Sequence, residues 1–220
     1  MALSLDTEES HGSSTPFVSG RIEFTNVDFA YPERPEVQVL NKASFAIRRN
    51  EMVAIVGSSG SGKSTVTALL QRLYEPQGGL ITIDGNDVSS MNVRYLRSQM
   101  ALVSQSTQLF DASISENISY GDPMLSVNDI CRAAKFANVH DFIMGLPRGY
   151  DTLVGENATL VSGGQAQRIQ IARALARDTA RILIFDECTS ALDPTTQLSV
   201  MESINAVRSG RTTVDRKSVV

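Results

Sequence analysis

A run of glycines and serines that ends in Lys-Ser-Thr has the composition of a phosphate-binding loop. It consists of Gly57, Ser58, Ser59, Gly60, Ser61, Gly62, Lys63, Ser64 and Thr65. The run satisfies G-x-x-x-x-G-K-[ST] directly after an apolar stretch and before a helical pattern. Glycines let backbone N–H groups point at phosphate oxygens, Lys63 supplies a cation for the β- and γ-phosphates, and Ser64 offers a hydroxyl to Mg²⁺. This glycine loop (residues 57–65) predicts a nucleoside triphosphate site. The alternative is a ligand-free Ser/Gly-rich turn, in which the fixed positions of the motif would match by chance.

Two acidic residues, Asp186 and Glu187, directly follow the apolar residues 182–185. Such a run is typical of a buried strand, and open α/β sheets bind ligands at the carboxyl ends of their strands. Asp186 is then placed to hold Mg²⁺ through water, and Glu187 to act as general base on a hydrolytic water. An acidic turn after a strand is common, so the functional interpretation of Asp186 and Glu187 depends on the presence of the glycine loop upstream.

A third cluster, residues 161–165, has the sequence Val-Ser-Gly-Gly-Gln and precedes a helical pattern. Ser162, Gly163, Gly164 and Gln165 place small side chains and bare N–H groups at a helix N-terminus, which is an anion site. A second phosphate site in one chain is useful if it completes the pocket of another copy. The alternative is an ordinary N-cap with glycines after it.

Hydrophobic periodicity predicts the elements that position these residues. Alternating or continuous apolar runs predict strands at 22–24, 43–47, 52–56, 100–104 and 181–185, a short strand with a turn at 80–85, and the start of a strand at 211–214. Helical spacing predicts helices at 64–73, 127–139, 165–176 and 195–207. The β-branched runs vanish from about 107 to 177, which predicts a helical insert. Residues 1–20 have the composition of a flexible linker, so the fold is expected to begin near Arg21.

The composition excludes several functional classes. The 220 residues carry a net charge of −4, with 20% charged and 42% hydrophobic residues, which is typical of globular proteins. The acidic balance argues against nucleic-acid binding, no apolar run approaches the roughly 20 residues of a membrane span, and the N-terminus lacks a secretory signal. Cys131 and Cys188 fit small buried thiols in a reducing compartment. His11 and His140 stand without ligand spacing, so no transition-metal site is predicted.

The ordered motifs resemble the ATP-binding cassette domain of ABC transporters, closest to the multidrug and peptide exporter branch that includes fungal mating-pheromone exporters. The resemblance covers about residues 21–214. It implies an α/β fold, namely a P-loop NTPase cassette with a RecA-like core and an N-terminal antiparallel β-subdomain. It also implies a helical subdomain inserted at about 106–178. The expected activity is ATP hydrolysis coupled to transport.

The resemblance assigns roles to further residues. Tyr31, within Phe-Ala-Tyr-Pro, matches the loop whose tyrosine stacks on adenine, and the alternative is a core tyrosine before a turn. Gln105 matches the Q-loop glutamine, which in the family touches Mg²⁺ and the membrane-domain interface, and we expect it to take part in catalysis. Residues 161–165 match the signature LSGGQ, and Asp193 matches the D-loop.

The resemblance also implies cofactors and partners. The cofactors are ATP and Mg²⁺. The partners are a second cassette, which closes head to tail around ATP, and the transmembrane domain of a longer parent exporter. The cassette is expected on the cytoplasmic face of a membrane, without a transmembrane segment of its own and without nucleic acid. The alternative is a non-transport cassette ATPase of DNA repair or translation, which uses the same glycine loop and signature.

The chain departs from the family pattern in several places. Val161 replaces leucine, Cys188 stands where alanine is commoner, and residues 106–107 are Ser-Thr where exporters often have Glu-Pro. The switch histidine expected after residues 212–214 is absent, and the chain reads Asp-Arg-Lys, which no core strand is expected to contain. We therefore hypothesise that residues 215–220 are a non-native tail, because one back-translation of them resembles a sequencing-library adapter. Such a truncated cassette is expected to bind ATP and to hydrolyse it poorly.

Overall fold

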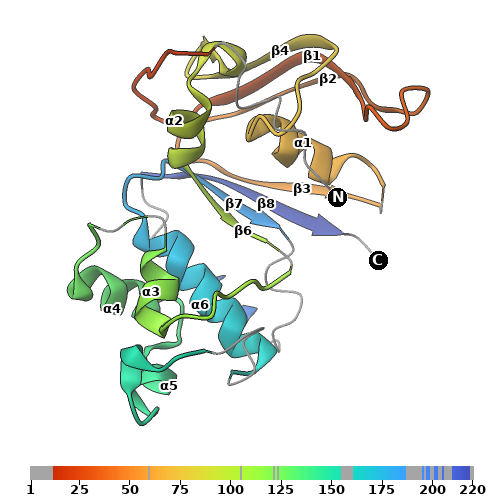
Figure 1. Ribbon diagram of the computed structural model, residues 1–220. Coiled ribbons are helices and arrows are strands. Elements are labelled where there is room, and N and C mark those ends of the chain that lie inside the picture. The colour runs from red at the N-terminus through yellow and green to blue at the C-terminus, as the bar shows by residue number, and fades with distance from the viewer. Residues whose placement is uncertain are drawn as a thin grey trace. The chain divides into compact units, whose positions relative to one another are not determined.

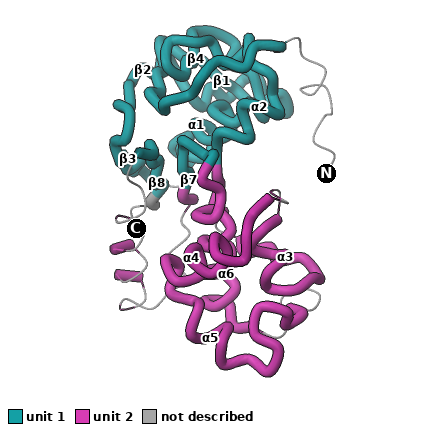
Figure 2. The backbone as a smooth tube through the Cα atoms, turned by 90° about the vertical axis from the view of Figure 1, so that its left-hand side faces the viewer, with its two compact units in different colours: residues 1–100, 179–184, 210–220 teal, residues 101–178, 185–209 magenta. Residues whose placement is uncertain are grey.

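The computed structural model describes residues 12–218, except 59, 105, 121, 123, 155–160, 187–194, 196, 199–200, 203–204 and 206–209. The chain divides into two compact units (Figure 2). Unit 1 is formed by the described residues within 1–100, 179–184 and 210–220, and unit 2 by those within 101–178 and 185–209. The predicted boundaries of the linker, the cassette, the helical subdomain and the tail stay predictions.

Unit 1 contains an antiparallel sheet with the strand order β2-β1-β4-β5. Figure 1 labels its strands β2, β1 and β4. The strands are β1 (Ile22–Ala30), β2 (Gln38–Ile47), β4 (Gly78–Ile83) and β5 (Asn86–Asp87). One face is buried because apolar side chains recur at alternate positions of the strands. Its fully or almost fully buried members are Ile22, Phe24, Val27, Phe29, Ile47, Ile81 and Ile83. This sheet confirms the predicted antiparallel β-subdomain.

A second sheet has the strand order β3-β8-β7-β6. Its strands are β3 (Met52–Gly57), β8 (Thr212–Ser218), β7 (Ile182–Asp186) and β6 (Met100–Val103). Strands β3 and β8 run parallel. The four apolar residues of β7 are all buried, as expected for a strand that is covered on both faces. The α/β fold predicted from the sequence is confirmed.

Strand β8 differs from the sequence prediction. We expected no core strand to contain the charged residues after Val214, yet β8 continues to Ser218, and Asp215 and Arg216 are only 6% and 8% exposed. That prediction is wrong. A buried charge is tolerated where it is paired or hydrogen-bonded; Asp215 has an interaction partner, and Arg216 donates a hydrogen bond to Ser64. The non-native origin of residues 215–220 stays a hypothesis.

Two helices of unit 1 follow strands of its sheets. Helix α1 (Lys63–Leu70) begins directly after the glycine loop, and its Val66, Leu69 and Leu70 belong to the main hydrophobic core. Helix α2 (Val93–Ser98) begins where the Asn92 side chain accepts a hydrogen bond from the backbone N–H of Tyr95. A short 3-10 helix, Val88–Ser90, precedes α2.

Unit 2 contains the predicted helical segment. Its helices are α3 (Ile114–Ser119), α4 (Val127–Phe136), α5 (His140–Met144) and α6 (Gly163–Ala176), with a 3-10 helix at Gly149–Asp151. Both α3 and α4 pack against α6. The helix expected at 195–207 falls largely outside the described residues. Within the described part of the chain, no helix has both the length and the apolar composition that a membrane crossing needs.

Candidate functional site

The glycine loop connects β3 to α1 in unit 1, as its motif predicts. Gly57 is the last residue of β3, and the backbone N–H of Ser61 donates to the carbonyl oxygen of Ser58 across 3.2 Å. Gly62 has a φ of +87°, and a Cβ there would lie 3.0 Å from Cδ2 of Leu40. Only glycine satisfies both conditions without strain. Gly62 therefore fixes the sharp entry into α1.

Lys63 folds back over the loop. Its Nζ donates to the carbonyl oxygens of Gly57 and Ser58 across 2.8 and 2.7 Å. The residue is only 7% exposed, so these carbonyl groups replace water around the ammonium group. The cation is held within the curve of the loop, where phosphate oxygens can replace the carbonyl groups as partners.

The N-terminus of α1 is open to an anion. Gly62 occupies the N-cap position and makes no side-chain cap hydrogen bond. The first backbone N–H groups of a helix lack partners within the helix, and the helix dipole adds partial positive charge there. The start of α1 therefore combines N–H groups that lack helical partners with the Lys63 ammonium in the same loop, and both groups suit a phosphate.

Ser64 does not fit Mg²⁺ as it stands. A nucleotide-bound Mg²⁺ takes one or two protein ligands and completes its octahedron with phosphates and waters. A cluster of three His, Cys, Asp or Glu side chains is therefore not required, and the described residues form none. However, Oγ of Ser64 accepts a hydrogen bond from Nη1 of Arg216. A guanidinium offers only N–H donors and a positive charge, both of which oppose a metal ion at this hydroxyl.

Tyr31 lies just after β1 and contacts α1. Its Oη is 2.9 Å from Oγ1 of Thr65. The ring meets Phe29 and Tyr74 edge to face, with centroids 5.0 and 5.2 Å away. The structure therefore brings Tyr31 to the glycine loop, and it also packs the ring partly against the core, as the alternative interpretation expected.

Sequence reasoning missed Gln77 and Arg216 as contacts of this site. The Gln77 side-chain amide accepts from the backbone N–H of Ala30 and donates to the Ala30 carbonyl oxygen, each across 2.8 Å. These two hydrogen bonds fix the backbone immediately before Tyr31. No sequence signal marks Gln77, because the contact depends on the antiparallel pairing of β1 with β4.

Several predicted site residues lie in unit 2 or outside the described residues. Asp186 is the last residue of β7, as the strand prediction required, and it is partly buried. Ser59, Gln105, Glu187 and Asp193 lie outside the described residues. Their predicted roles stay predictions.

The signature segment, residues 161–165, opens α6 as predicted. Ser162 is the N-cap, and its Oγ accepts from the Gln165 N–H across 3.3 Å, while Gln165 Oε1 accepts from the Ser162 N–H across 2.8 Å. This reciprocal capping box agrees with the ordinary N-cap interpretation. Gly163, however, has no atom within 4 Å of where a Cβ would stand, and Gly164 follows it in the first turn. No described neighbour in the chain demands a glycine at position 163.

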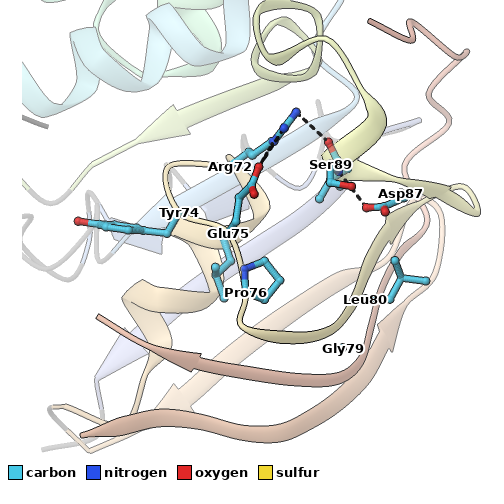
Figure 3. A pocket seen from close by; sticks show the side chains of 10 residues that line it. Arg72, Tyr74, Glu75, Pro76, Gly79, Leu80, Asp87 and Ser89 are labelled. Atoms are coloured by element: carbon cyan, nitrogen blue, oxygen red, sulfur yellow. Dashed lines mark hydrogen bonds and ion pairs between the residues drawn. The ribbon is translucent and has the colours of Figure 1, made fainter. Parts of the chain in front are cut away.

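Unit 1 also contains a small pocket, which Figure 3 shows. Arg72, Tyr74, Glu75, Asp87 and Ser89 are among its lining residues. Its volume of about 170 Å³ is below the roughly 300–1,000 Å³ of small-molecule sites. The Arg72 guanidinium is committed to Glu75, 2.9 Å away, and to the Met91 carbonyl oxygen, also 2.9 Å away. The pocket lining includes no residue of the glycine loop, and this arginine braces the backbone around it.

Comparisons with known proteins identify the family of the chain. The family described as ABC transporter matches residues 40–190. Multidrug resistance protein pgp-1 of Caenorhabditis elegans is 50% identical over 197 residues, 89% of this chain and 15% of its own length. ATP-binding cassette sub-family B member 5 of Homo sapiens is 46% identical over 211 residues, 96% of this chain and 17% of its own length.

A solved structure supports the fold. It is the structure of a bacterial Atm1-family ABC exporter with ATP bound, and it matches with a TM-score of 0.87 and 39% identity. The match covers 96% of this chain and 36% of the exporter chain. The chain thus spans about a third of that structure's chain and, in the two relatives above, 15% and 17% of their length.

Proposed function

Because this chain belongs to the ABC transporter family, we propose that it is an ATP-binding cassette that powers export as part of a longer transporter. The observation that carries the proposal is the glycine loop, where Lys63 lies over the carbonyl groups of Gly57 and Ser58 at the open N-terminus of α1. The family description, ABC transporter, and the match to a solved ABC exporter support the transport part. They do not favour a cassette of DNA repair or translation.

The loop residues bind the triphosphate of ATP. Backbone N–H groups of residues 60–65 donate to the β- and γ-phosphate oxygens, and the Lys63 ammonium exchanges its two carbonyl partners for phosphate. A charge-assisted hydrogen bond of this kind contributes about 1.5–3 kcal/mol. Tyr31, whose hydroxyl contacts Thr65 and whose preceding residue Ala30 is held by Gln77, presents its ring to adenine.

The signature segment acts on a second cassette. Ser162 and Gln165 stabilise the start of α6, and Gly163 leaves the helix N-terminus bare. A bare N-terminus lets the γ-phosphate of ATP held by another copy approach the backbone closely. Two cassettes then close head to tail, so that each pocket combines one glycine loop with the partner's signature segment.

The hydrolytic roles belong to residues that follow strands β6 and β7 in the sequence. Glu187 is the general base that takes a proton from the attacking water, Gln105 takes part in catalysis, and Asp193 contacts the nucleotide of the paired cassette. In the family Mg²⁺ accompanies ATP and neutralises phosphate charge, and Asp186 and Gln105 are the other two residues predicted to hold it. Since Ser64 is held by Arg216, no step of this proposal depends on the metal.

The cassette works on the cytoplasmic face of a membrane. It is attached there to the transmembrane domain of the parent exporter, whose helices move when the paired cassettes close and reopen. The exported substrate is selected by that domain.

Calorimetric titration with ATP, in EDTA and in Mg²⁺, tests the nucleotide part of the proposal. Lys63→Ala should weaken binding by at least about tenfold in the buffer where the wild type binds, since about 1.4 kcal/mol corresponds to that factor. Lys135→Ala is the control, because Lys135 is an exposed lysine on α4. Equal affinities of wild type and Lys63→Ala in that buffer would place ATP elsewhere.

A further inference from the structure

Arg216 lies on the face of β8 that α1 covers. Parallel pairing sets Arg216 opposite Ile55 of β3. Successive strand residues point to opposite faces, so Arg216 shares a face with Val214, which packs in the core cluster with Val66 and Leu69 of α1. Arg216 is the next residue on that face toward the first turn of α1.

The Arg216 side chain ends at the glycine loop. Its Nη1 donates to Oγ of Ser64, and the residue is 8% exposed. We propose that Arg216 replaces the metal ion in this chain: it holds the Ser64 hydroxyl and makes the glycine loop a site for metal-free nucleoside triphosphate. This inference rests on the proposed function, because it requires a nucleotide at the loop.

The Ser64 hydroxyl cannot bind Mg²⁺ and the Arg216 guanidinium in the same way. Mg²⁺ needs oxygen lone pairs at about 2.0–2.1 Å in near-ideal octahedral geometry. The Ser64 oxygen instead accepts an N–H from Arg216, and a guanidinium beside it repels a divalent cation. The same guanidinium is well suited to phosphate, because its planar N–H groups donate to oxygen atoms in pairs.

Lys63 and Arg216 together bring two positive charges to the glycine loop. The Lys63 Nζ is 2.8 Å from the Gly57 carbonyl oxygen and 2.7 Å from that of Ser58, so it lies on the strand side of the loop. Arg216 brings a second positive charge to the Ser64 hydroxyl. A loop of this motif ordinarily combines one lysine with Mg²⁺, whereas this chain supplies both positive charges from its own side chains.

Isothermal titration calorimetry of the 220-residue chain with ATP, once in EDTA and once in excess Mg²⁺, tests the proposal. The wild type should bind ATP in EDTA at least as tightly as in Mg²⁺. Arg216→Ile, which places a strand-favouring apolar residue in β8, should bind at least about tenfold more tightly in Mg²⁺ than in EDTA. Arg216→Met, which keeps an unbranched stem, should behave in the same way and serves if the isoleucine variant unfolds.

The matched control is Arg49→Ile, because Arg49 is an exposed arginine of unit 1 and its loss removes the same charge. It should keep the wild-type response to Mg²⁺. The inference is wrong if the wild type binds ATP at least about tenfold more tightly with Mg²⁺ than in EDTA. It is also wrong if the Arg216 variants respond to Mg²⁺ as the wild type does. In both cases the proposed function would still stand. If wild type and variants all fail to bind ATP in both buffers, the proposed function itself is wrong.

Discussion

The phenolic oxygen of Tyr31 lies 2.9 Å from the side-chain oxygen of Thr65. One residue directly follows β1 of the antiparallel sheet, and the other belongs to the first turn of α1. The hydrogen bond therefore ties the two parts of unit 1 from which a nucleotide would be held, the aromatic ring and the glycine loop.

Replacing Tyr31 separates the roles of its hydroxyl and its ring. Tyr31→Phe removes the hydrogen bond to Thr65 and should lower the free energy of unfolding by about 0.5–1.5 kcal/mol, with little change in ATP affinity. Tyr31→Ala also removes the ring and should weaken ATP binding severalfold. Urea unfolding and ATP titration of both variants provide the measurements. Equal ATP affinity of the alanine variant and the wild type would contradict the role of the ring.

Asp84 anchors the segment that precedes β1. Its carboxylate accepts hydrogen bonds from the backbone N–H groups of Ser19, Gly20 and Arg21, at 2.6, 2.9 and 3.0 Å, and from the Ser19 hydroxyl. Partial burial by itself raises the pKa of Asp84, but these donors favour the charged form and bring the pKa below its usual value.

The lowered pKa of Asp84 predicts a loss of stability in acid. The stabilisation is complete above the ordinary pKa near 3.8 and is lost as the pH falls through the lowered pKa of the folded state. Asp84→Asn should reduce the free energy of unfolding at neutral pH by about 1 kcal/mol, a figure that allows for solvent screening. Urea midpoints from pH 7 down to pH 3 should show the gap between wild type and variant closing. A gap that stays constant across that range would argue against the anchor.

From the open space at Gly163, in the first turn of α6, we predict that this glycine is needed for contact with a second cassette and not for the stability of the chain. A Cβ at Gly163 meets nothing within 4 Å, so Gly163→Ala should raise the free energy of unfolding by up to about 1 kcal/mol. The same variant should weaken ATP-dependent dimerisation of the chain. Thermal unfolding and size-exclusion chromatography with ATP measure the two effects. Dimers of wild-type strength would show that the bare helix start is not an interface.

Arg173 organises unit 2 around α6. Its Nε donates to the Asn117 carbonyl oxygen across 2.6 Å and its Nη2 to Asn117 Oδ1 across 2.8 Å. The guanidinium carbon lies 5.2 Å from the centre of the Phe110 ring, which stacks on Tyr120. Burial lowers the pKa of Arg173, so this cation depends on its fixed partners.

Arg173→Lys should therefore be destabilising although it keeps the charge. The ammonium group cannot reproduce the planar set of donors, and the loss should amount to about 1–3 kcal/mol in urea unfolding. Arg132→Lys is the control, because Arg132 makes surface ion pairs with Asp129 and Asp178, which contribute at most about 1 kcal/mol. Similar losses for both variants would mean that the Arg173 contacts add nothing beyond charge.

The long periodic elements of this chain are predictable from its sequence. The apolar run before Gly57, the loop composition and the helix after it specify β3, the glycine loop and α1 with errors of a few residues. The same holds for β7, which ends at Asp186, and for α6. Family membership follows from these motifs, whereas the narrower resemblance to mating-pheromone exporters stays a prediction.

The sequence analysis did not predict the short helices, because a helix of fewer than two turns is too short to show a 3.6-residue hydrophobic period. Helices α2, α3 and α5 have only six, six and five residues, and their starts depend on caps. The Ser113 to Glu116 capping box of α3 is a sequence signature that could have located it. Contacts between distant segments, such as Gln77 with Ala30, have no such signature.

Strand β8 shows the limit of judging a strand by its apolar content. The charges of Asp215 and Arg216 argued against burial, and only the position of Ser64 beside the strand shows why the arginine is accepted. A binding partner that comes from another part of the chain cannot be read from the strand itself.

The register in which β8 pairs with β3 decides which charged side chain lies at the glycine loop. Residues 215–217 are acidic, basic and basic, and the parallel register selects Arg216 to face Ser64. If one residue were inserted ahead of β8, Asp215 would take that place and a carboxylate would face Ser64. A negative charge would then stand where Arg216 brings a positive one, with Lys63 still positive at the loop, although no residue between 57 and 65 had changed.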